Sequence, residues 1–125
     1  MQKDIKKEFI EICKSEKEEV CGFFVSSNEN IKIIKCENQS NKRINEFIIS
    51  PKEYIEVSKS NKILGIFHSH IDCSSDFSNQ DIKTSEELNF TFFVYSCLDD
   101  NINIYKPKEV EKNKELKRLI KYLKN

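Results

Sequence analysis

The chain has 125 residues, of which 34% are charged and 38% hydrophobic, and its charges cancel to a formal net charge of zero. This length suits one domain with a buried core and leaves no room for a second. We therefore expect a single domain over residues 1–125, and the neutral balance argues against nucleic acid and anionic membranes as partners.

Two further features concern the compartment. No segment reaches the roughly 20 apolar residues that a membrane span needs, and the N-terminus has no apolar stretch typical of a signal peptide. Five cysteines are scattered along the chain without a CxxC pair. We expect a cytoplasmic protein with reduced thiols, and neither a disulfide framework nor a zinc finger.

The first half of the chain alternates between helical and strand patterns. Apolar residues at helical spacing predict a helix over residues 3–15. Two segments rich in β-branched and aromatic residues, separated by SNEN, predict a hairpin over 20–37. The segment ENQSNKR (37–43) is a predicted loop, and FIIS (47–50) is a predicted short strand. A serine, a proline and a glutamate in capping positions then predict a helix over 51–58.

The second half begins with KILGIFH, an apolar run typical of a buried strand, which delivers His68 at its end. A polar loop follows, and Ser78 is the predicted N-cap of another helix with Asp81 as its third residue. NFTFFVYSC and INIYKP predict two more strands. One apolar stripe predicts a final helix and consists of Leu116, Leu119, Ile120 and Leu123. Helices mixed with a mainly antiparallel sheet predict the α+β class.

Three of these residues suit a catalytic metal. If the strand continues through His68 and His70, both imidazoles leave the same face of the sheet, because strand side chains alternate. Asp81 follows a loop long enough to fold back, and its carboxylate completes three ligands with one position open for water. A water at such a site needs a base, and Glu19, at the mouth of the first predicted strand, is the best-placed candidate.

Each residue also has a simpler interpretation. Histidines at a strand end are often polar surface residues, and the segment from Ser78 to Asp81 is also a capping box. Glu19 lies in the run SEKEEV, which is typical of a solvated turn. Cys73 near two histidines suggests a thiol nucleophile, but its polar loop contains no orienting structure.

Together these segments resemble a known family. HSHIDCSSDFSNQD resembles the HxH and SxxD signature of the JAMM metalloproteases, also called MPN-plus or JAB domains. EVCGFF resembles the ExCG strand that carries the catalytic glutamate of that family. The resemblance covers the chain from the first helix to about Lys106. It implies a curved, mainly antiparallel sheet flanked by helices, one Zn²⁺, and hydrolysis of peptide or isopeptide bonds in an extended protein tail.

The resemblance also implies a role for each matching residue. His68, His70 and Asp81 would be the zinc ligands. Glu19 would take a proton from the zinc-bound water and pass it to the leaving amine, and Ser78 would hydrogen-bond the oxyanion. This chain departs from the family pattern at one point, because an isoleucine follows the second histidine where proline is usual.

Within the family, the compact layout resembles the bacterial and phage branch, which includes phage tail-assembly proteins. The expected location is thus the cytoplasm of a bacterium or of a phage-infected host, and the expected partner a ubiquitin-like or phage tail protein. Two alternatives are a non-catalytic MPN-like scaffold and a structural phage tail-assembly protein. A zinc deaminase is disfavoured because the HxE and PCxxC pattern of that chemistry is absent.

Overall fold

The structure is a computed structural model that describes residues 4–42, 47–108 and 113–124. These residues contain nine helices and strands. In chain order they are α1 (Ile5–Lys14), β1 (Cys21–Ser27), β2 (Asn30–Cys36), α2 (Pro51–Ser60), β3 (Lys62–His70), α3 (Asn79–Leu88), β4 (Thr91–Ser96), β5 (Asn101–Tyr105) and α4 (Lys114–Lys124).

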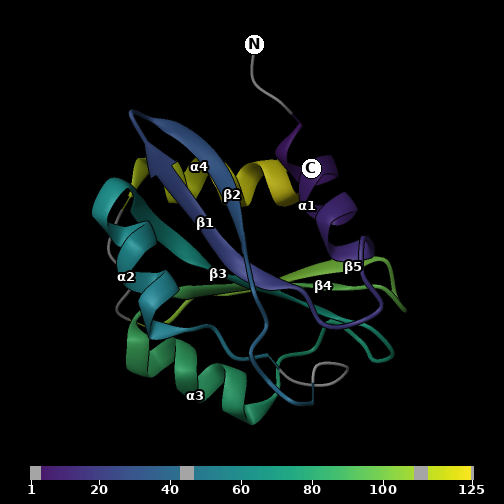
Figure 1. The fold of residues 1–125 in the computed structure, drawn as a ribbon. Coiled ribbons are helices and arrows are strands. Elements are labelled where there is room, and N and C mark those ends of the chain that lie inside the picture. The colour runs from purple at the N-terminus through teal and green to yellow at the C-terminus, as the bar shows by residue number, and fades with distance from the viewer. Residues whose placement is uncertain (1–3, 43–46, 109–112, 125) are drawn as a thin grey trace.

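The five strands form one sheet in the order β2-β1-β3-β4-β5 (Figure 1). All neighbouring strands are antiparallel except β3 and β4, which are parallel. A parallel pair needs a crossover connection, and α3 lies in the segment that makes it. The fold is therefore α+β with a mainly antiparallel sheet flanked by helices, as the sequence predicted.

One face of the sheet is covered by α1 and α4 (Figure 1). Phe9 of α1 lies at the centre of this layer, with its ring centroid 5.1 Å from that of Phe24, 5.3 Å from Phe67 and 6.5 Å from Tyr95. These rings meet edge to face, a favourable geometry for aromatic pairs. The buried side of α4 is the predicted stripe and includes Leu116, Leu119 and Leu123.

The opposite face carries a smaller apolar cluster beneath α2, and α3 lies on the same side (Figure 1). The buried members of this cluster are Phe23, Val25, Cys36, Ile66 and Phe92. Because alternate residues of a strand point to the same side, the face that begins with Ile66 continues along β3 to His68 and His70. The apolar cluster thus ends where the polar site begins.

A single carboxylate ties α3 to the end of β5. The Tyr105 hydroxyl donates to Glu86 Oε2 at 2.5 Å, and the Lys108 N–H donates to Glu86 Oε1 at 3.2 Å. These bonds join the C-terminal half of α3 to the end of the sheet.

Most predicted elements are confirmed, with ends that differ by a few residues. The start of the first helix at residue 3 and the end of the loop at residue 43 lie outside the described residues. β3 runs on to His70, so both histidines belong to the strand. Within the described ranges, no helix is both long enough and apolar enough to span a bilayer.

The predicted strand over residues 47–50 is wrong. Its backbone makes no strand ladder, because the N–H and carbonyl of Ile48 are bonded within the loop. The Ile48 N–H donates to the side-chain oxygen of Asn38 at 3.0 Å, and the Ile48 carbonyl accepts from the Gln39 N–H at 2.9 Å. High β propensity does not by itself predict a strand, because side-chain groups can take up the backbone hydrogen bonds that a partner strand would make.

The five cysteines all lie within the described residues and are free thiols. Cys13, Cys21 and Cys36 are buried, and burial is the main cause that raises the pKa of Cys21 to about 12. Such thiols act as small core residues. Cys73 alone among them is exposed.

Both glycines lie where neighbouring strands approach too closely for a side chain. A Cβ atom on Gly22 would collide with the carbonyl oxygen of Ile34 on β2 and would lie 2.8 Å from the ring of Phe67. A Cβ atom on Gly65 would collide with the carbonyl oxygen of Thr91 on β4. Because a backbone carbonyl cannot rotate away as a side chain can, relief requires the strands to separate.

We expect Gly22→Ala and Gly65→Ala each to lower the free energy of unfolding by about 1 to 3 kcal/mol, the usual range for overpacking. Urea denaturation followed by circular dichroism measures this. Lys32→Ala, at an exposed position of β2, is the control and should stay within about 0.5 kcal/mol of the wild type. A Gly22→Ala protein as stable as the Lys32→Ala protein would contradict the close approach.

Candidate metal and catalytic site

The register of the sheet places the two histidines in adjacent rows of side chains. His68 pairs with Cys21 on β1 and with Val94 on β4, and Val94 pairs with Asn103 on β5. Paired residues on neighbouring strands point to the same side. This row therefore presents His68 on the face that bears α3.

The next row contains His70. It pairs with Ser96 on β4, which in turn pairs with Asn101 on β5. On the other side, the Ser69 N–H donates to the Val20 carbonyl at 2.9 Å, so the pairing of β1 with β3 continues past the end of β1. Glu19 therefore reaches the edge of the same row, and it lines a cleft together with His70.

The three predicted ligands converge on one point. His68 Nε2 lies 3.2 Å from His70 Nε2 and 3.4 Å from Asp81 Oδ2. The three ligand atoms all lie within 4.8 Å of one another. Among the described residues, this is the one group of histidine, cysteine and carboxylate side chains so arranged.

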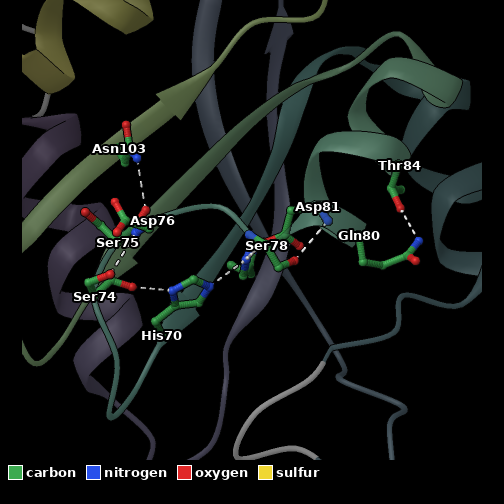
Figure 2. Close-up of polar contacts among 10 residues, drawn as sticks. His70, Ser74, Ser75, Asp76, Ser78, Gln80, Asp81, Thr84 and Asn103 are labelled. Carbon is green, nitrogen blue, oxygen red and sulfur yellow. Dashed lines mark hydrogen bonds and ion pairs between the residues drawn. The ribbon is translucent and has the colours of Figure 1, made fainter.

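The orientation of His70 is set by a backbone carbonyl. His70 Nδ1 lies 2.6 Å from the Ser74 carbonyl oxygen, a contact that Figure 2 shows. Since a carbonyl can only accept, the hydrogen of the neutral ring lies on Nδ1. Nε2 is left with its lone pair directed toward His68 and Asp81, which is the tautomer that a metal ligand requires.

His68 is held by packing instead. Its ring is 1% exposed and stacks on Phe47, with ring centroids 4.4 Å apart and planes inclined by 22°. Its Nδ1 is buried and has no hydrogen-bond partner. Burial is the main cause that lowers the pKa of the imidazole below 6.5, so the ring is neutral near pH 7 and can act as a ligand.

Asp81 has two structural roles at the start of α3. Its Oδ2 accepts the Ser78 N–H at 3.2 Å, and its own N–H donates to Ser78 Oγ at 3.0 Å, which together make the predicted capping box (Figure 2). Burial alone would raise the pKa of the carboxyl, but hydrogen bonds from His68 and Ser78 outweigh it, and the pKa lies below its usual value. The group is therefore ionised at neutral pH.

Glu19 is 5% exposed, which excludes the solvated turn as an account of its side chain. Its carbonyl accepts from Asn38 Nδ2 at 3.1 Å, which ties this end of β1 to the loop that carries Phe47. The cleft that it lines has a volume of about 710 Å³ and includes the three candidate ligands, Ser78 and Cys73. Beyond them its walls are largely apolar and include Phe47, Ile48, Ile49, Phe77, Leu88 and Phe92.

The donor set could hold a metal ion such as zinc. Two imidazole nitrogens and one carboxylate oxygen leave a fourth position open. Ligand atoms about 2.0 to 2.1 Å from a tetrahedral ion lie roughly 3.3 Å apart. The two separations from His68 Nε2, 3.2 and 3.4 Å, match that spacing, and the third lies within 4.8 Å. The lone pair of His70 and the ionised Asp81 point into the same gap.

Sequence reasoning missed the residues that support the ligands. Phe47 lies in the segment that the sequence predicts as a strand. Ser74 acts through its backbone carbonyl, a role that no side-chain pattern in the sequence indicates. Asn101 and Asn103 lie on a strand far along the chain, and only the register brings them to the loop after His70. Because a metal-ligating histidine usually donates its second ring N–H to a carbonyl or carboxylate, the proposed ligand role does predict a partner of the kind that Ser74 provides for His70.

The fold is thus a mixed sheet between two helix pairs, with this cluster at the end of its central strand. The sequence matches the family described as prokaryotic homologs of the JAB domain over residues 3–111, and the chain belongs to that family. The search of curated proteins gives no match.

Three solved structures share the fold. Protein DSY2949 from Desulfitobacterium hafniense has a TM-score of 0.58 at 13% identity, covering 88% of this chain and 90% of its own. AF2198, a JAB1/MPN domain protein from Archaeoglobus fulgidus, has 0.52 at 21% identity, covering 88% and 89%. A protein from Salinibacter ruber has 0.50 at 14% identity, covering 92% and 94%.

Two serines cap helices on the site-bearing face and allow a matched comparison. Ser78 Oγ accepts at the start of α3 and Ser50 Oγ accepts from the Lys52 N–H at the start of α2. We expect Ser78→Ala and Ser50→Ala each to lower the free energy of unfolding by about 0.5 to 2 kcal/mol. Denaturant titration measures both, and an unchanged Ser78→Ala protein would show that the capping box contributes nothing to stability.

Proposed function

We propose that this protein is a zinc-dependent metallopeptidase or isopeptidase of the JAMM type. The observation that carries the proposal is the convergence of His68, His70 and Asp81 beside the buried carboxylate of Glu19. This arrangement is useful when a cation and a reacting water occupy the site.

In this proposal His68 Nε2, His70 Nε2 and one Asp81 oxygen hold the zinc. Zinc in such a site lowers the pKa of water and polarises a carbonyl group. The chain's part is to present these donors already oriented. The Ser74 carbonyl orients one ring, Phe47 the other, and the capping box the carboxylate.

Glu19 is the proposed general base and acid. Its carboxylate takes a proton from the water as the water oxygen forms a bond to the scissile carbonyl carbon. When the C–N bond breaks, the same group passes that proton to the leaving nitrogen. Its burial keeps bulk water away from the carboxylate during both transfers.

Ser78 is the proposed donor to the substrate carbonyl oxygen. Its Oγ accepts the Asp81 N–H, and a hydroxyl that accepts one bond can still donate its own proton. A donor aimed at the oxygen where charge develops stabilises the transition state more than the ground state. Ser78 thus serves both α3 and the reaction.

The proposed substrate is an extended protein tail, such as that of a ubiquitin-like protein or a phage tail component. An open cleft with apolar walls beyond the ligands supports a chain segment as the occupant. A non-catalytic scaffold and a structural phage tail-assembly protein are the competing functions, and metal content together with turnover separates them from the peptidase.

Glu19 and Asp81 provide the decisive pair of variants. Glu19→Gln should retain zinc and stability but lose about a hundredfold to ten-thousandfold in turnover, because only the proton transfer is removed. Asp81→Ala should lose zinc and turnover together, and stability should fall by about 0.5 to 2 kcal/mol with the capping box. The measurements are zinc per chain by plasma mass spectrometry and initial rates on the peptide cut fastest from a fluorogenic library.

Glu18→Gln is the control, since Glu18 is the neighbouring acid and is exposed. Its turnover should equal that of the wild type. Normal turnover of Glu19→Gln would remove Glu19 from the mechanism. A wild type that binds zinc but cuts neither peptides nor isopeptide-linked reporters would favour the scaffold.

A further inference from the structure

β5 contributes no candidate ligand, yet two of its side chains hold the loop that follows β3. Asn103 Nδ2 donates to the Ser75 carbonyl at 3.0 Å, as Figure 2 shows. The other end of this amide is also occupied, because Asn103 Oδ1 accepts the Ile104 N–H at 3.0 Å. The two bonds together assign the orientation of the amide, with its NH₂ group toward the loop.

Asn101 holds the same residue by its side chain. Its Nδ2 donates to Ser75 Oγ at 2.7 Å, and Ser75 is only 5% exposed. Ser75 is thus bonded at both its carbonyl and its hydroxyl. The two asparagines are alternate residues of β5, so they leave the same face of the sheet as His68 and His70.

A third bond holds the loop on the other side of Ser74. Ser96 Oγ, at the end of β4, donates to the Cys73 carbonyl at 2.6 Å and accepts the Asp99 N–H at 3.0 Å. The backbone is therefore anchored at Cys73 and at Ser75. Ser74, whose carbonyl accepts from His70 Nδ1, lies between the two anchors.

We propose that Asn101 and Asn103 are positioning residues of the metal site, which act by holding the Ser74 carbonyl against His70 Nδ1. If that carbonyl moves away, the hydrogen of the neutral ring is no longer held on Nδ1, and moving it off Nε2 becomes an added cost of metal binding. The effect on metal affinity rests on the proposed function, because it requires that the site binds zinc. The state of His70 can be measured without one.

The test uses Asn101→Ala, Asn103→Ala and Asn103→Asp. The aspartate keeps the shape of Asn103 but loses the NH₂ donor, so it separates the hydrogen bond from packing. Asn61→Ala is the matched control, because Asn61 Nδ2 also donates to a backbone carbonyl, that of Val57, at 3.0 Å at the end of α2.

The first measurement is the zinc dissociation constant of each full-length protein, from competition with a chromogenic chelator. Loss of a group that orients a ligand typically weakens metal binding by about 10- to 100-fold. We expect this loss for the Asn101 and Asn103 variants and wild-type affinity for Asn61→Ala. Equal weakening in all four variants would overturn the proposal, because it would reflect general destabilisation.

The second measurement is the tautomer of His70 in the zinc-free protein, from long-range ¹H–¹⁵N correlation spectra at about pH 8, above the ordinary histidine pKa. The wild type and Asn61→Ala should show the hydrogen on Nδ1, and the Asn103→Asp protein a mixture of tautomers. Retention of the Nδ1 hydrogen in every variant would overturn the proposal. A wild type that binds no zinc would refute the proposed function, while the tautomer data would still decide the role of the asparagines.

Discussion

The site depends on the pairing of β3 with β1 on one side and β4 on the other. That register places a buried acid, two imidazoles, a serine and two asparagines in two adjacent rows on one face of the sheet. A shift of one residue would turn both imidazoles to the opposite face, into the aromatic layer beneath α1. The two glycines, which permit the close approach of these strands, are therefore part of the site's construction.

The cluster also shows how buried polar groups are accommodated at the edge of a core. Unpaired polar atoms in such surroundings cost stability, so each must find a partner or remain neutral. His70 and Asp81 have backbone partners, whereas His68 relies on burial and on the ring of Phe47. The three candidate ligand atoms thus contact one another at the point where a cation would bind.

Local patterns in the sequence predicted the features that depend on contacts between residues close together in the chain. The capping box of Ser78 and Asp81, the apolar stripe of α4 and the buried run of β3 all depend on neighbours within a few residues. The segment 47–50 is not the predicted strand, because Ile48 pairs with the side chain of Asn38 and the N–H of Gln39 and not with a strand. The loop after His70 could not be predicted, since its bonds to β5 join residues 26 and 28 positions apart.

β5 is an edge strand, yet both of its faces are in use. Ile102 and Ile104 pack against the aromatic layer, while the two asparagines face the loop. Edge strands usually tolerate polar exchanges on a solvated face. In this protein, the side chains at four consecutive positions of β5 (101–104) have contacts to preserve, so we expect β5 to tolerate fewer substitutions than an edge strand with a solvated face. Substitutions should be better tolerated in the turn that precedes β5.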